Sequence, residues 1–140
     1  MILLDTNVIS EPLRPSPDSH VSNWIDAQPM ETLYLSAMTV AELRAGVALM
    51  PFGKRQHALH EDIEKRVLPM FAGRVLPFDV ACTNAYAELV ARARQAGSVI
   101  QTADALIAAV ALVNGFSVAT RDVKPFQSAG LNVINPWQDL

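Results

Sequence analysis

Four acidic side chains stand at positions where they can act together. Asp5 and Asp122 each follow a short apolar run typical of a buried strand, and Glu42 and Asp104 each lie near the start of an expected helix. Parallel strands end at one edge of their sheet, and the helices that follow begin there, so the four carboxylates can converge. Clustered carboxylates repel one another, and Mg²⁺ or Mn²⁺, which prefer oxygen ligands, would neutralise them. The pattern predicts an acidic metal site.

Asp104 supports this interpretation most strongly. Its expected helix, Thr102 to Asn114, is apolar on nearly every side and should therefore be buried. A carboxylate in such surroundings costs several kcal/mol, to order of magnitude, unless a partner compensates its charge.

A site of this kind suits phosphodiester hydrolysis. A metal-bound water is a nucleophile near neutral pH, and a second ion can stabilise the leaving oxygen. The net charge of −3 argues against nucleic-acid binding by the chain's own cations alone, but bound metal ions would attract phosphate. Arg44, Arg121 and Lys124 are candidate phosphate contacts, and solvated surface charge is an equally good interpretation of them.

Each acid also fits an ordinary structural role when taken singly. Asp5 and Asp122 are common types of turn residue. Glu42 can complete a capping box with Thr39, and Asp104 can complement a helix N-terminus. The joint arrangement of the four acids, rather than any one of them, favours the metal site.

The expected elements alternate between strands and helices. We expect strands at Ile2–Leu4, Leu33–Ser36, Val75–Phe78, Phe116–Ala119 and Asn132–Ile134. We expect helices after a cap at Asp18 or Ser19, and at Thr39–Leu49, Lys54–Met70, Val80–Gln95 and Thr102–Asn114, the last capped by Thr102, while Pro12–Pro17 forms a loop. Such alternation predicts an α/β fold with a mostly parallel sheet covered on both faces. The length of 140 residues predicts a single domain, 1–140.

Composition excludes several classes of protein. With 51% hydrophobic and 18% charged residues, the chain is expected to fold compactly. The longest apolar run, Ala105 to Val113, is too short to span a bilayer, and the N-terminus lacks the basic region of a signal peptide. The single cysteine, Cys82, is expected in the core and is consistent with the cytoplasm. No glycine-rich phosphate loop follows any expected strand.

Two other groups of residues have alternative interpretations. His57, His60, Glu61 and Glu64 share a helical spacing that could bind metal, but a solvated helix face is the preferred interpretation. Trp24 and Trp137 could stack on bases, but are more commonly core or interface anchors.

Four segments together resemble a known family. They are Met1–Asn7, Ser36–Gly46, the helix that carries Asp104, and Thr120–Asp122. In this order, and over essentially the whole chain, they resemble PIN-domain proteins of the VapC toxin family, and FitB-type members are the most similar.

The resemblance implies a three-layer α/β/α sandwich and a Mg²⁺- or Mn²⁺-dependent endoribonuclease, the toxin of a type II toxin–antitoxin system. It implies that Asp5, Glu42, Asp104 and Asp122 form the catalytic metal site. It also implies supporting roles for three polar residues, Thr6, Asn7 and Thr120. It further implies an RNA substrate, a homodimer, and a small antitoxin with a DNA-binding half.

Two rival functions remain open. Asp5 could be the covalent nucleophile of a phosphatase, but enzymes of the haloacid dehalogenase type have a second acid two residues later, where this chain has Asn7. Alternatively, the protein could be a non-catalytic partner in an antitoxin complex. The high apolar content, with helices apolar on more than one side, independently favours a homodimer.

Overall fold

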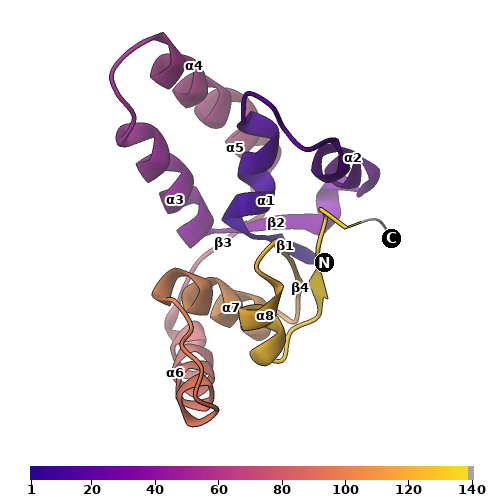
Figure 1. Ribbon diagram of the computed structural model, residues 1–140, viewed down its shortest axis with the longest axis vertical. Helices are drawn as coiled ribbons and strands as arrows, with labels where there is room; N and C mark the ends of the chain where they lie inside the picture. The colour runs from indigo at the N-terminus through magenta and orange to yellow at the C-terminus, as the bar shows by residue number, and fades with distance from the viewer. Residues whose placement is uncertain (139–140) are drawn as a thin grey trace.

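The computed structural model describes residues 1–138, and within them a parallel sheet of five strands forms the centre of the molecule (Figure 1). The strands are β1 (Ile2–Leu4), β2 (Leu33–Ser36), β3 (Val75–Leu76), β4 (Ser117–Ala119) and β5 (Val133–Ile134). Their spatial order is β3-β2-β1-β4-β5, so the chain builds outward from β1 in one direction and then in the other. The strand order therefore reverses between β1 and β4, which is where ligands bind in open parallel sheets.

Helical segments connect the strands. They are α1 (Thr6–Ser10), η1 (Glu11–Leu13), α2 (Ser19–Ala27), η2 (Met30–Thr32), α3 (Ala37–Ala48), α4 (Lys54–Asp62), η3 (Ile63–Val67), α5 (Leu68–Met70), α6 (Val80–Gln95), α7 (Thr102–Asn114) and α8 (Val123–Ser128). Figure 1 shows α1 to α5 on one side of the sheet and α6, α7 and α8 on the other. The predicted three-layer α/β/α sandwich is confirmed. No helix among residues 1–138 is long and apolar enough to cross a membrane.

Alternation along the strands builds a separate core on each face of the sheet. Leu3 and Val118 pack with α6, α7 and α8, whereas Leu4 and Ala119 pack with the helices of the opposite layer. Successive side chains of a strand point to opposite faces, so a strand buried on both sides must be apolar throughout. This requirement explains why the strands were recognisable from short apolar runs.

The predicted strands and longer helices are confirmed with small shifts at their ends. β3, β4 and β5 are each one or two residues shorter than expected. Two short α-helices were not predicted, α1 and α8, which begin directly after Asp5 and Asp122, and neither were the 3-10 turns η1 and η2. The segment Pro12–Pro17 is a loop only in part, because Pro12 lies in η1.

One predicted helix cap, at Thr102, is wrong, and so is the capping box that was the alternative interpretation of Glu42. Ser36 caps α3, since its hydroxyl accepts a hydrogen bond from the backbone N–H of Thr39 at 3.1 Å, so Glu42 is not part of a capping box. Thr102 is the first residue of α7 rather than its cap, and Gln101 at the cap position makes no side-chain capping bond. By contrast, Asp18 caps α2 as one of the two expected candidates.

The expected helix from Lys54 to Met70 is continuous but contains a wide π-helical turn, η3. Pro69 accounts for the irregularity, because it has no N–H to donate and its ring crowds the carbonyl of Lys65, one turn earlier. Widening the preceding turn relieves that clash.

Candidate metal centre

Asp5 is the most rigidly held of the four acids. It follows β1, and its backbone N–H donates to the carbonyl of Ala119 on β4 at 2.9 Å. Its Oδ1 accepts from the backbone N–H of Thr6 at 2.8 Å, and its Oδ2 accepts from the Thr120 hydroxyl at 2.7 Å. Only 4% of the residue is exposed. The carboxylate therefore has one fixed orientation between the two central strands.

Burial raises the pKa of the Asp5 carboxyl from 3.8 to about 6. The hydrogen bonds from Thr120 and Thr6 oppose this shift, and the negative charges of Asp104 and Glu42 add to it. A buried carboxylate near other carboxylates is a strained group unless a positive charge compensates it.

Glu42 reaches the site from α3 and is oriented by Thr6. The Thr6 hydroxyl donates to Glu42 Oε1 at 2.8 Å and lies 3.1 Å from the hydroxyl of Thr39. Thr39 in turn lies 3.3 Å from the capping hydroxyl of Ser36. A chain of hydroxyls thus links the start of α3 to Glu42. Ser36 and Thr39 were not predicted as members of the site. Their spacing of three residues at the start of a helix is a pattern that the sequence shows.

Asp122 is placed by the turn after β4. Its backbone N–H donates to the Thr120 hydroxyl at 3.0 Å, so one threonine orients both Asp5 and Asp122. The Asn7 amide lies 3.5 Å from Asp122 Oδ2, and its carbonyl oxygen accepts from the N–H of Arg121 at 3.3 Å. Thr6, Asn7 and Thr120, the three polar residues expected to support the acids, therefore all contact the site.

Asp104 lies in the first turn of α7 and is half-buried. Burial raises the pKa of its carboxyl, and the charges of Asp122 and Glu42 raise it further. Since Asp5 is coupled to Asp104 and Glu42, the electrostatic contacts connect all four acids across β1, β4, α3 and α7. The structure brings the four predicted site residues to one edge of the sheet.

The donor set fits a hard divalent cation but forms no closed cage. Every candidate ligand is an oxygen, which suits Mg²⁺ or Mn²⁺ and not zinc. Within residues 1–138, no three His, Cys, Asp or Glu side chains are arranged to hold an ion by themselves. Mg²⁺ commonly uses one or two carboxylates, several waters and the phosphates of its substrate. An open acidic site matches that mode of binding.

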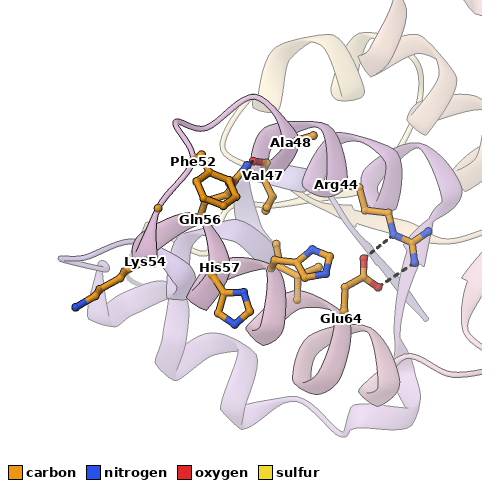
Figure 2. Close-up of a pocket in the computed structure, with 11 residues that line it drawn as sticks. Arg44, Val47, Ala48, Phe52, Lys54, Gln56, His57 and Glu64 are labelled. Carbon is orange, nitrogen blue, oxygen red and sulfur yellow. Dashed lines mark hydrogen bonds and ion pairs between the residues drawn. The ribbon is translucent and has the colours of Figure 1, made fainter.

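The three candidate phosphate contacts lie in different surroundings. Arg44 is paired with Glu64, with N–O distances of 2.9 and 3.1 Å, on a cavity of about 760 Å³ between α3 and α4 (Figure 2). The guanidinium of Arg121 stacks over the ring of Trp137, 5.1 Å from its centre. Lys124 lines a cavity of about 600 Å³ whose wall includes Asp104 and Asp122. Of the three, Lys124 is in the position most suitable for a phosphate contact.

The helix face that carries His57 and His60 is exposed to solvent, in agreement with the interpretation preferred from the sequence. Both acids of this face form ion pairs. Glu61 pairs with Lys65 at 2.6 Å, and Glu64 pairs with Arg44. In the described part of the chain, this face forms no metal-binding group.

The tryptophans and the cysteine are structural, as expected. Trp24 and Trp137 pack against the core on the α1–α5 side of the sheet. Cys82 is buried in the other core, where burial raises the pKa of its thiol.

A third cavity, of about 270 Å³, adjoins the acids on the side of Glu42 and Thr6. Two arginines that were not predicted from the sequence, Arg14 and Arg55, also line this cavity. No local pattern marks them, because their approach to Glu42 depends on how α4 packs against α1 and α3.

A family model described as PIN domain matches residues 2–130. The chain belongs to the PIN-domain family. Three relatives of this PIN domain each align over 99% or more of both chains. The plasmid stability protein StbB of Pseudomonas syringae pv. tomato is 70% identical, and VapC ribonuclease Y4jK of Sinorhizobium fredii is 58% identical. Toxin FitB of Neisseria gonorrhoeae is 52% identical.

Solved structures share this PIN-domain fold closely. The crystal structure of FitAcB from Neisseria gonorrhoeae matches with a TM-score of 0.95 and 52% identity, covering 98% of this chain and 99% of that one. The structure of FitAB bound to an IR36 DNA fragment matches with a TM-score of 0.97 and 51% identity, covering 100% of this chain and 98% of that one.

Proposed function

We propose that this PIN domain is a Mg²⁺- or Mn²⁺-dependent endoribonuclease and the toxin of a type II toxin–antitoxin system. The observation that carries the proposal is the electrostatic coupling of Asp5, Glu42, Asp104 and Asp122 at the carboxyl edge of the sheet. Relatives named ribonuclease and toxin, similar over the whole chain, support the same activity.

In this proposal, each element of the site has a defined task. A divalent cation, when bound, supplies a water that is nucleophilic near neutral pH and positive charge for the leaving oxygen. Asp5, fixed by Thr6 and Thr120, is the principal ligand, because its buried charge gains most from a cation. Glu42 and Asp104 approach from opposite layers of the sandwich and complete the acidic surface.

The geometry does not favour Asp5 as a covalent nucleophile. Both oxygens of the carboxylate already accept hydrogen bonds, and the group is almost fully buried. Each oxygen keeps a second lone pair that can bind a cation, but a phosphatase nucleophile must also move toward the phosphorus to form a covalent bond, and the two hydrogen bonds and burial oppose that movement. A ligand role is compatible with this environment.

The proposal includes the partners and the setting of the protein. FitAB, whose structure resembles this chain, is bound to DNA in its solved complex, which supports a small antitoxin partner with a DNA-binding half. The exposed side chains of Leu49, Phe52 and Val80 support a homodimer or a protein partner. We place the whole chain, 1–140, in one domain that acts on RNA in the cytoplasm.

An RNA cleavage assay with matched variants tests the proposal. Purified wild type is expected to cleave RNA in Mg²⁺ or Mn²⁺ and to stop when EDTA is added. Glu42→Gln should abolish cleavage, whereas Glu31→Gln, the same change at an exposed position away from the site, should not. Cleavage that persists in excess chelator, or in Glu42→Gln, contradicts the proposal.

A further inference from the structure

The residues that line the cavity of about 270 Å³ beside Glu42 come mainly from α1, α3 and the helix that begins at Lys54. Glu42 and Thr6, which are hydrogen bonded to each other, form its end nearest to the acids. Its floor is largely apolar, with Leu43 and Leu59 among the lining residues. A compartment that opens directly beside the reacting centre is placed to hold the part of the substrate next to the bond that is cut.

The cations on this cavity are Arg14 and Arg55. Arg14 is held in place by Glu11, whose oxygens lie 3.1 and 3.3 Å from its Nη1. Glu11 is only 3% exposed and also accepts from the backbone N–H of Asp18, so it is a rigid anchor. Arg14 thus has one edge of its guanidinium fixed and the remaining N–H groups available to a ligand.

Arg55 stands in a different situation. It is exposed and makes no ion pair within residues 1–138. Elsewhere around the site, Arg44 is occupied by Glu64, and Arg121 is stacked on Trp137. Arg55 therefore lies beside the acids, and its N–H groups form no ion pair with a carboxylate in the described part of the chain.

Gly46 supplies an independent observation. It lies inside α3, where glycine is among the least favourable residues, and it lines the same cavity. A Cβ added there would meet no atom within 4 Å, so packing within this chain does not require a glycine. Because Gly46 has no side chain and faces open space, a ligand in the cavity can approach the backbone of α3 closely.

We propose that this cavity is a nucleotide subsite of the ribonuclease, which binds the RNA residue adjacent to the cleaved bond. The apolar wall around Gly46 takes a base or ribose, and Arg14 and Arg55 take its phosphate. The volume of about 270 Å³ is slightly smaller than the range of about 300–1,000 Å³ typical of small-ligand pockets, so the cavity has room for one nucleotide at most. This inference rests on the proposed ribonuclease function.

The test compares Arg55→Gln and Gly46→Leu with Lys54→Gln, a neighbouring control that removes the same charge from the other side of the helix, where Lys54 lines the larger cavity. Binding of a fluorescein-labelled short RNA of randomised sequence is measured by anisotropy in Ca²⁺. Cleavage of the same RNA is measured in Mg²⁺, and thermal melting verifies folding.

We expect Arg55→Gln to bind about tenfold more weakly, the size of effect of one charged hydrogen bond. The slope of log affinity against log salt should fall by about 0.7, as for one lost phosphate contact on a single strand. Gly46→Leu should also weaken binding about tenfold while melting no lower than wild type, and Lys54→Gln should match wild type.

Equal binding by Arg55→Gln and Lys54→Gln overturns the subsite, even if wild-type cleavage shows that the ribonuclease proposal holds. If Gly46→Leu keeps RNA affinity but loses the cognate antitoxin, the cavity docks protein and the inference is wrong. If wild type neither binds nor cleaves RNA, the proposed function itself fails.

Discussion

Replacing Asp5 by asparagine tests whether the buried carboxylate is strained without metal. Burial raises the pKa of this group from 3.8 to about 6, a difference of about 2 units. At about 1.4 kcal/mol per unit, the ionised carboxylate destabilises the fold by about 3 kcal/mol at neutral pH. Because the residue is only 4% exposed, solvent screening does little to reduce this figure.

The substitution also removes a favourable contact. Asparagine keeps one acceptor oxygen but cannot accept from both Thr6 and Thr120, and losing one hydrogen bond costs about 1 kcal/mol. The net gain in the free energy of unfolding is about 2 kcal/mol at pH 7 in EDTA. For a chain of this length, that corresponds to a rise in melting temperature of about 8 °C.

The sign of the effect depends on pH. The folded-state pKa of Asp5 lies above its unfolded value, so the carboxyl stabilises the fold fully below about pH 3.8, and that stability is lost as pH rises through about 6. The asparagine side chain in the variant cannot ionise and shows no such loss. The variant should therefore melt slightly below wild type near pH 3.5 and clearly above it at pH 7.

The assay is thermal melting of both proteins across this pH range in EDTA, repeated at pH 7 with millimolar Mg²⁺. Wild type should gain stability from Mg²⁺, because a ligand that binds only the folded state stabilises it, and Asp5→Asn should gain far less. If the variant melts lower than wild type at every pH and gains equally from Mg²⁺, the reasoning about Asp5 is refuted.

Three further outcomes are expected. Asp104→Asn should melt higher than wild type in EDTA at neutral pH, because the variant no longer buries a negative charge beside Asp122 and Glu42, and this relief should exceed the roughly 0.3–1 kcal/mol that a carboxylate gains at a helix N-terminus. A lower melting temperature would mean that Asp104 only stabilises the end of its helix. Thr6→Val should lose most RNA cleavage and about 1 kcal/mol of stability by urea unfolding, since Glu42 loses its hydroxyl donor; unchanged cleavage would contradict its orienting role. Sedimentation of the protein alone at micromolar concentration should show a homodimer, and a monomer would count against it.

The fold was largely predictable because burial is visible in local composition. Strands buried on both faces appear as short apolar runs, and Gly115 ends α7 in a left-handed conformation at φ 70°, as its position after Asn114 suggests. The short helices α1 and α8 were not predictable, because five or six residues are too few to show a helical period.

The acids of the site were predictable, but most of its surroundings were not. Asp5 and Asp122 are marked by their place after apolar runs, and parallel topology alone brings them to one edge. The pairing of Arg44 with Glu64 joins residues 20 apart and depends on how two helices pack. Arg55 reaches the cavity of Glu42 for the same reason, and no periodicity within its own helix indicates that approach.

Crystals grown in Mn²⁺ test the central claim most directly, because the anomalous signal of manganese locates the ion independently of any assay. We predict a manganese peak within coordination distance of an Asp5 oxygen, with Glu42, Asp104 or Asp122 in the same coordination sphere, directly or through water. The Asp5→Asn protein should lose that peak. A manganese peak at His57 and His60 instead, or none at the acids, would contradict the account.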